Sequence, residues 1–118
     1  MILADTSVWV EHLRTGSERL RSLLHSEQVL CHPLVVGELA CGTLRNRQEI
    51  LSTLRALPEA RVAEPEEVLR FVGTRRLYGR GLGWVDVSLL ASALLTGCML
   101  WTFDKPLRKA AAALGALE

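Results

Sequence analysis

The stretch ILADTSVWVEHLR, residues 2–14, joins a short apolar run to a longer run with helical periodicity. Ile2–Ala4 is apolar and short, which is typical of a buried strand. The next three residues, Asp-Thr-Ser, form a cluster that often begins a helix, and we predict a helix from about Thr6 to Arg14. A strand followed directly by a helix is the repeating unit of proteins with a parallel sheet.

The rest of the chain continues this alternation of short apolar segments and helical patterns. We predict further strands at Gln28–Cys31, Arg61–Ala63 and Met99–Thr102. We predict further helices after Gly16-Ser17, from Pro33 to Gly42, over Asn46–Ala56, from Pro65 onward, over Val85–Leu95 and over Lys105–Leu114. This order of elements is that of an α/β sandwich around a short, mostly parallel sheet.

Length and composition indicate one globular domain. The 118 residues are 49% hydrophobic and 23% charged, which excludes a disordered chain. A chain of this length builds its core without disulfide bonds or a structural metal. We therefore expect residues 1–118 to form a single domain.

The cysteines and the distribution of charge favour a cytoplasmic protein. The chain has three cysteines, Cys31, Cys41 and Cys98, and no two of them form a CxxC pair. Because their number is odd, we expect reduced thiols in the core. Cys31, His32 and Cys41 do not have the spacing of a zinc site. The chain begins without a basic segment, which argues against a signal peptide. Asp86 interrupts the longest uncharged stretch, which argues against a membrane span.

Aspartate occurs at only three positions, and each lies at the start of a predicted helix. Asp5 and Asp104 follow predicted strands, and Asp86 follows the glycine-rich segment Gly79–Gly83. Each one alone has an ordinary explanation, because aspartate is a preferred N-cap. The carboxyl ends of parallel strands meet at one edge of a sheet, where ligand sites form. We therefore expect the three carboxylates to converge at that edge.

Glu38 is the fourth candidate carboxylate, and capping does not explain it. It lies more than a turn inside its predicted helix, among the apolar residues of PLVVGELACG. An exposed surface glutamate is one interpretation. Its apolar neighbours and the adjacent Gly37 favour a packed location that another group approaches closely, since glycine otherwise destabilises a helix by up to about 1 kcal/mol.

Four carboxylates at one edge of a sheet repel one another unless a cation lies between them. Oxygen ligands favour Mg²⁺ or Mn²⁺, and such ions activate water and stabilise the leaving oxygen in phosphodiester hydrolysis. The net charge is only +1, but the chain is basic once these four acids are set aside, and arginine far outnumbers lysine. Arginine suits bidentate contacts with phosphate, although a genome rich in G and C also explains its abundance.

Four segments of the chain together resemble those of PIN-domain proteins. They are ILADTSVWVEHLR, VVGELACG, GRGLGWVDVSLLASAL and LWTFDKPLRKAA, and in this order they cover essentially the whole chain. The closer resemblance is to the VapC toxins of bacterial VapBC toxin–antitoxin pairs. It implies a PIN-like three-layer sandwich with a short, mostly parallel central sheet flanked by helices. It also implies a Mg²⁺- or Mn²⁺-dependent endoribonuclease that is inhibited by a cognate VapB-like antitoxin and is usually a homodimer.

The resemblance also assigns roles to individual residues. The positions that match the acidic quartet of the family are Asp5, Glu38, Asp86 and Asp104. Asp5 and Asp86 are the implied main metal ligands, and the other two hold a second ion or orient its waters. Thr6 and Thr102 match hydroxyl positions that support the site, although a helix-start residue and a strand residue are the ordinary interpretations of these two threonines.

Some cations and aromatic residues near these acids are candidates for contact with RNA. The cations are Arg80, Lys105 and Arg108, and for each of them a solvated surface charge is the alternative. The tryptophans are Trp9, Trp84 and Trp101. Base stacking is one role for them, but at their helix and strand positions we expect core packing.

Other proteins of similar length fit the sequence less well. A signalling receiver domain needs a phosphoacceptor aspartate near mid-chain, but no aspartate lies between Thr6 and Val85. A haloacid-dehalogenase-like phosphatase needs Asp-x-Asp, where this chain has Asp5-Thr6-Ser7. Two alternatives share the PIN fold. One is a catalytically silent protein-binding module, but all four acidic residues are present, which argues against it. The other is a metal-dependent DNase, but the sequence shows no DNA-binding element.

Overall fold

Three short strands form the centre of the computed structural model, which describes residues 1–118. They are β1 (Ile2–Ala4), β2 (Val29–Leu30) and β3 (Met99–Trp101), and they form one parallel sheet in the order β2-β1-β3. Leu3 of β1 lies opposite Leu30 on one side and opposite Leu100 on the other. All three residues of β1 are buried, as expected for the central strand of a parallel sheet covered by helices.

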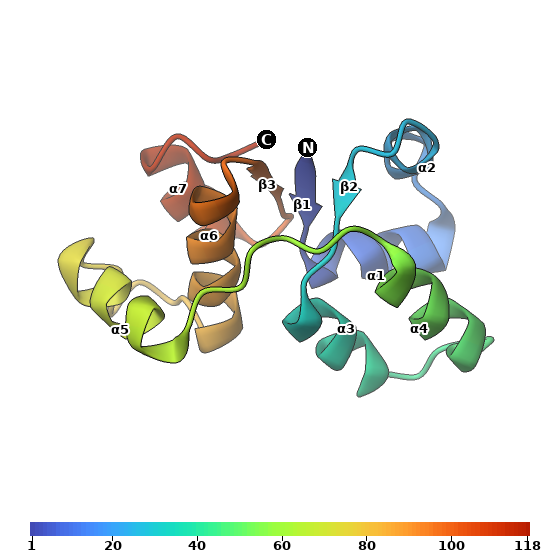
Figure 1. Cartoon of the computed structure of the whole chain (residues 1–118), viewed down its shortest axis with the longest axis horizontal. Helices are drawn as coiled ribbons and strands as arrows, with labels where there is room; N and C mark the ends of the chain where they lie inside the picture. Colours follow the sequence, from blue (N-terminus) through green and yellow to red (C-terminus); the bar gives the residue numbers. More distant parts are fainter.

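Seven helices surround the sheet. They are α1 (Thr6–Thr15), α2 (Glu18–His25), α3 (Pro33–Ala40), α4 (Arg47–Ala56), α5 (Pro65–Thr74), α6 (Trp84–Thr96) and α7 (Lys105–Ala113). In Figure 1, α1 to α4 lie on one side of the strands and α5 to α7 lie on the other, and the segment 57–64 crosses between the two groups. The predicted α/β sandwich with a parallel central sheet is confirmed.

The strand predicted at Arg61–Ala63 is wrong. The chain pairs near this point only through a single parallel bridge to the end of β2. The Cys31 N–H donates to the carbonyl of Pro58 at 2.8 Å, and the Ala60 N–H donates to the carbonyl of Cys31 at 2.9 Å. Beyond this bridge Val62 is 48% exposed. Further pairing would therefore bury little apolar surface, and the backbone continues without forming a strand.

α6 is the most deeply buried helix of the protein. Every residue from Val87 to Ala93 is buried, which agrees with the apolar pattern that the sequence shows on most faces of this segment. The helix ends at Gly97, whose φ of 75° is a left-handed conformation that favours glycine. None of the helices is both long and apolar enough to cross a membrane.

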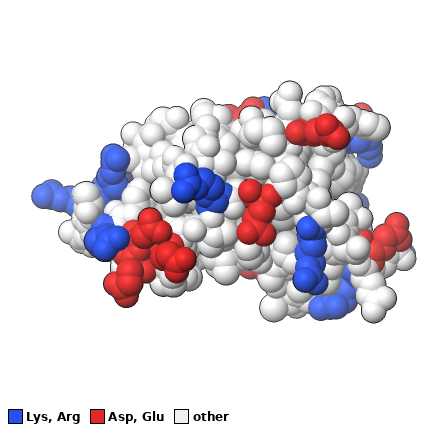
Figure 2. Space-filling view, viewed as in Figure 1, with Lys and Arg blue, Asp and Glu red and all other residues white.

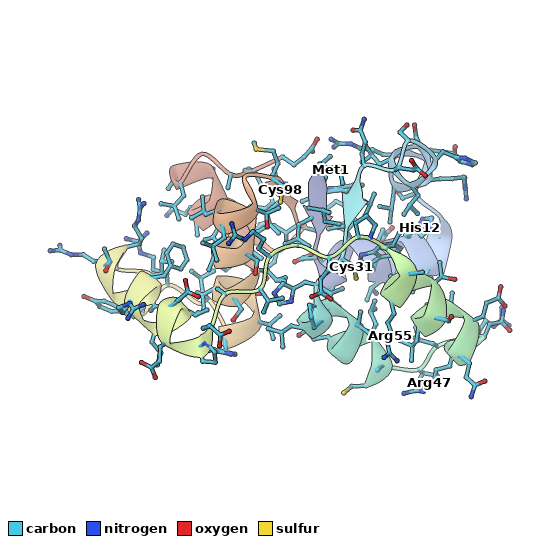
Figure 3. The ribbon with its side chains drawn as sticks, viewed as in Figure 1. Met1, His12, Cys31, Arg47, Arg55 and Cys98 are labelled. Carbon is cyan, nitrogen blue, oxygen red and sulfur yellow. The ribbon has the colours of Figure 1, made fainter.

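The three cysteines are free, but they do not all lie in the core. Cys31 and Cys98 are buried, and Figure 3 shows them beside the two outer strands of the sheet. Cys41 is exposed, which corrects the prediction that it packs inside. The reason is local, since Cys41 is the C-cap of α3 and follows the last apolar turn of that helix.

The tryptophans also divide between core and surface. Trp9 and Trp101 are buried, as the sequence predicts. The guanidinium of Arg19 lies over the ring of Trp101, 4.8 Å from its centroid, and covers it from outside. Trp84 is 46% exposed, contrary to the expectation of core packing. It is the first residue of α6, at the point where this helix begins at the surface.

Candidate metal centre

β1 and β3 end at the same edge of the sheet, which places Asp5 next to Thr102. The Asp5 N–H donates to the carbonyl of Trp101 at 3.0 Å. Asp5 is 5% exposed and Thr102 is fully buried. The Thr102 hydroxyl donates to Asp5 Oδ2 at 2.6 Å and accepts a hydrogen bond from the Asp104 N–H at 3.0 Å. One buried hydroxyl therefore connects the residues at two of the predicted positions.

The other carboxylate oxygen of Asp5 is held from its own helix. Oδ1 accepts hydrogen bonds from the Ser7 hydroxyl at 2.5 Å and from the Val8 N–H at 3.3 Å, so that Asp5 is the N-cap of α1. The Ser7 hydroxyl in turn accepts from the Phe103 N–H at 3.0 Å. The sequence-based prediction gave Ser7 no role, although its place in the Asp-Thr-Ser cluster was a signal for one.

Glu38 lies on α3, and its surroundings differ from the prediction. Its Oε1 accepts a hydrogen bond from the Thr6 hydroxyl at 2.5 Å. The glutamate is exposed rather than packed, because Val35 and Leu39 fill the buried face of this short helix. A Cβ atom added to Gly37 would meet nothing within 4 Å. The close approach that was expected at Gly37 is therefore not found.

Asp86 and Asp104 each accept a backbone hydrogen bond at a helix start. Asp104 is exposed and is the N-cap of α7, with Oδ2 accepting from the Leu107 N–H at 3.1 Å. Asp86 is half-buried and is the third residue of α6 rather than its cap. Its Oδ2 accepts from the N–H of Gly83, the actual N-cap residue, at 2.8 Å. Both carboxylates are thereby fixed at the surface near the sheet edge.

The charges of the other three candidate acids act together on Asp86. Burial raises the pKa of the Asp86 carboxyl above its ordinary value, and the Gly83 N–H opposes this change. The negative charges of Asp104, Asp5 and Glu38 raise the pKa of Asp86 further. These residues come from four separate parts of the chain, so the fold gathers their charges in one region.

No lysine or arginine forms an ion pair with any of these four carboxylates. The ion pairs of the protein join Arg19 to Glu118 and Arg21 to Glu18. As the side chains stand, no three His, Cys, Asp or Glu residues converge closely enough to hold a metal ion. The chemistry of the donor set nevertheless fits a hard divalent cation, because all of the donors are oxygens.

Each carboxylate in this set has a protein donor on at least one of its oxygens. Three oxygens accept no hydrogen bond, namely Glu38 Oε2, Asp86 Oδ1 and Asp104 Oδ1. In Glu38, Asp86 and Asp104 the protein therefore orients one carboxylate oxygen and leaves the other available to a cation. Asp5 accepts hydrogen bonds on both oxygens, and its Oδ2, which accepts only one, keeps a lone pair for a cation. The residues present therefore fit Mg²⁺ or Mn²⁺.

A buried histidine connects the two helices that carry Glu38 and Asp86. His32 is 2% exposed and is the N-cap of α3, with Nδ1 accepting from the Leu34 N–H at 3.0 Å. Because Nδ1 is an acceptor, the ring proton lies on Nε2, which faces the Ser92 hydroxyl of α6 at 3.0 Å. Burial lowers the pKa of His32. The sequence alone gave no sign of this contact, which spans 60 positions.

The predicted cations lie around this region but do not pair with the acids. Arg108 is exposed, and its Nη1 donates to the carbonyl of Thr102 at 3.1 Å. Lys105 and Arg80 are exposed, and neither forms a hydrogen bond or an ion pair within the protein. A hollow of about 680 Å³ opens on the other side of the site, beside Thr6 and Glu38. Its lining includes two more cations, Arg14 and Arg45.

The fold and the site together define the class of protein. It is an α/β protein with acidic side chains gathered at the carboxyl edge of a three-stranded parallel sheet. The PIN domain family matches residues 2–113 of the chain. The chain belongs to the PIN-domain family, and the resemblance seen in the sequence is confirmed.

Individual relatives agree with this assignment. Ribonuclease VapC32 from two strains of Mycobacterium tuberculosis is 53% identical to this chain over 116 residues, which are 98% of the chain and 94% of the relative. This similarity supports a VapC-type member of the family. The crystal structure of PAE2754 from Pyrobaculum aerophilum has a TM-score of 0.60 and covers 98% of this chain and 89% of its own. At 18% identity it shows a shared fold alone.

Proposed function

We propose that this protein is a divalent-metal-dependent endoribonuclease that acts as the toxin of a type II toxin–antitoxin pair. The observation that carries the proposal is a set of four carboxylates, in which the charges of three act on the fourth, Asp86, with no lysine or arginine paired to any of them. Such a set is stabilised by a divalent cation and is suited to phosphodiester hydrolysis. The name of the relatives, Ribonuclease VapC32, supports RNA as the substrate.

The proposed cofactor is Mg²⁺ or Mn²⁺. Its proposed ligands are Asp5 and Asp86, with Glu38 and Asp104 for a second ion or its waters. When bound, such an ion supplies an activated water and stabilises the leaving oxygen. The hydroxyls of Thr6 and Thr102 orient the carboxylates of Glu38 and Asp5. Partners of this kind tune ligand geometry and basicity in metal sites.

The proposed RNA contacts are local rather than spread over a broad basic surface. Figure 2 shows charges of both signs mixed across one face of the molecule. Arg80, Lys105 and Arg108 are the proposed contacts, since Lys105 and Arg108 lie on the helix that Asp104 caps and Arg80 lies in the loop before Asp86. The further proposed partners are a VapB-like antitoxin and a second copy of the chain, and the proposed setting is the cytoplasm.

The activity is tested by incubating single-stranded RNA and DNA of the same sequence with purified protein. We expect RNA cleavage with Mg²⁺ or Mn²⁺ and none with a chelator. Asp5→Asn and Asp86→Asn should each lower the cleavage rate by more than about 100-fold. This loss is larger than the one expected when a residue that only hydrogen-bonds to a metal ligand is replaced. Thermal unfolding and circular dichroism of both variants should show that the fold persists.

Two outcomes would select an alternative. Cleavage of DNA but not RNA would identify a DNase with the same metal chemistry. Absence of any cleavage would favour a silent protein-binding module. Cleavage that persists in both variants would show that a contaminating nuclease is responsible. Glu49→Gln is the matched control, because it removes one negative charge from an exposed position in the first turn of α4 and should leave cleavage unchanged.

A further inference from the structure

A second hollow, distinct from the hollow beside Thr6 and Glu38, lies between the glycine-rich loop and α7. Its volume is about 270 Å³, and it is lined by Arg80, Pro106, Lys109 and Ala110. We call it the Arg80–Lys109 pocket. Lys109 was not among the residues that the sequence singled out, because its place beside Arg80 depends on how the loop packs.

The walls of the Arg80–Lys109 pocket are held together by a close contact. Gly81 has a φ of 76°, a left-handed conformation that disfavours other residues, and a Cβ added to it would lie 3.6 Å from Pro106 Cγ. The loop therefore lies against the first turn of α7. Lys109 follows Pro106 by three residues, so the two share one face of the helix. This arrangement brings Lys109 and Arg80 to the same hollow.

The pocket carries two positive charges and no negative one. Arg80 and Lys109 are both exposed, and neither side chain takes part in an ion pair or a hydrogen bond within the protein. None of the lining residues is acidic. Two like charges that face one hollow repel each other, and an anion between them removes the repulsion. Arginine and lysine together are the usual protein ligands of a phosphate group.

Both walls of the pocket also lead to the candidate metal centre. The loop ends at Gly83, whose N–H holds Asp86, and α7 begins directly after its cap, Asp104. Lys109 lies five residues beyond Asp104, which is about 7.5 Å along a helix axis. Lys109 therefore lies beyond the first turn of α7, where a cation can contact the part of a bound strand next to the group held by the carboxylates.

We propose that the Arg80–Lys109 pocket binds a phosphate of the RNA backbone beside the one that is cleaved. This inference rests on the proposed ribonuclease function and deepens it, since it assigns the pocket to positioning of the strand rather than to the reaction. Phosphate contacts fix register and orientation without reading sequence. The pocket would therefore hold any single-stranded RNA with similar strength.

The test measures RNA binding without cleavage. A fluorescent single-stranded RNA is titrated with the protein in a chelator, at several salt concentrations, and the dissociation constant is obtained from anisotropy. The double variant Arg80→Ala/Lys109→Ala should bind about tenfold or more weakly, because charge-assisted hydrogen bonds are lost. The slope of log affinity against log salt should become shallower by about 0.7, as expected for one lost phosphate contact on a single strand.

The matched control is Arg61→Ala/Arg70→Ala, which removes the same charge from exposed positions outside the pocket. The Arg61 N–H bonds Thr96 at the end of α6 farthest from Asp86. An equal loss of RNA affinity in both double variants would show a general effect of charge. It would overturn the proposal that the Arg80–Lys109 pocket binds a phosphate. Because binding is measured in a chelator, a wild-type protein that fails to cleave RNA would overturn the proposed function without deciding the pocket's role in binding.

Discussion

The hydroxyl of Thr102 donates to Asp5 Oδ2 at 2.6 Å across 97 positions of the sequence. The same hydroxyl oxygen accepts from the Asp104 N–H. Since a hydroxyl has only one proton, this second contact leaves the proton for Asp5 alone. One oxygen of the Asp5 carboxylate is therefore held by a residue that follows β3, 97 positions away in the sequence, while the other is held by α1.

The first prediction concerns this hydroxyl. Thr102→Val keeps the shape of the side chain but leaves the buried Asp5 oxygen without its donor and the Asp104 N–H without its acceptor. We expect the free energy of unfolding to fall by about 1–3 kcal/mol. The affinity for Mn²⁺, measured by calorimetry, should fall by about 10–100-fold. Thr102→Ser, which restores the hydroxyl, is the control, and unchanged metal affinity in the valine variant would show that the hydroxyl does not orient a ligand.

The second prediction concerns the crowding of charge at Asp86. In a chelator, Asp86→Asn should unfold at a temperature higher than wild type by a few degrees at most, because the variant removes a charge that faces three other carboxylates. Mg²⁺ should raise the unfolding temperature of wild type but not of the variant, as expected when a ligand binds only the folded state. A variant that is less stable than wild type in the chelator would contradict repulsion at this site.

The third prediction concerns acid. Burial lowers the pKa of His32 below its ordinary 6.5, and burial and the charge of Arg21 do the same for His12. The unfolded chain therefore takes up protons before the folded protein does. The stability contributed by both residues is complete above pH 6.5 and is lost as the pH falls through their folded pKa values. Urea denaturation should show lower stability at about pH 5 than at about pH 7.5.

His32→Asn separates this effect from other titrations, including that of Asp86, whose raised pKa acts in the opposite direction. Asparagine is a good N-cap and does not titrate. The variant should be less stable than wild type at about pH 7.5, because the contact with Ser92 is lost, but should lose less stability on acidification. The control is His25→Asn, at an exposed position. The same pH dependence in His32→Asn as in wild type would contradict the role assigned to His32.

The fourth prediction concerns Gly37. A Cβ at this helical position meets open space, so Gly37→Ala should stabilise the protein by about 0.5–1 kcal/mol in urea denaturation. Gly81→Ala provides the contrast. At its φ of 76° a side chain is strained, and we expect a loss of about 1–2 kcal/mol. Destabilisation by Gly37→Ala would mean that the backbone there is more tightly enclosed than the structure shows.

Much of the fold was predictable because its signals are local. Each strand of the sheet is an apolar run, and the N-caps Asp5 and Asp104 directly precede the helices that they begin. The strand prediction at Arg61–Ala63 is wrong because a short apolar run does not show whether a neighbouring strand extends far enough to pair with it. The exposure of Glu38 was missed for a related reason, since apolar neighbours in sequence occupy other faces of the same helix.

The site was predictable as a list of residues and less so as an arrangement. The structure places Asp5, Glu38 and Asp104 so that their charges act on Asp86, and the role of the four acids as metal ligands stays a prediction. The contacts that hold the site were not predictable, because Ser7 with Phe103 and His32 with Ser92 join distant parts of the chain. Such contacts depend on the packed fold, to which a single sequence gives no direct access.

The pairing of β1 with β3 has a consequence for the synthesis of this protein. The ribosome makes Ile2–Ala4 well before Met99–Trp101, and only the second of these segments completes the sheet around the first. A nascent chain that ends before Met99 lacks one strand, the carboxylate of Asp104 and the Thr102 hydroxyl that holds Asp5. The candidate centre therefore assembles only after the ribosome has made Asp104, and any shorter nascent chain carries an incomplete set of the proposed metal ligands.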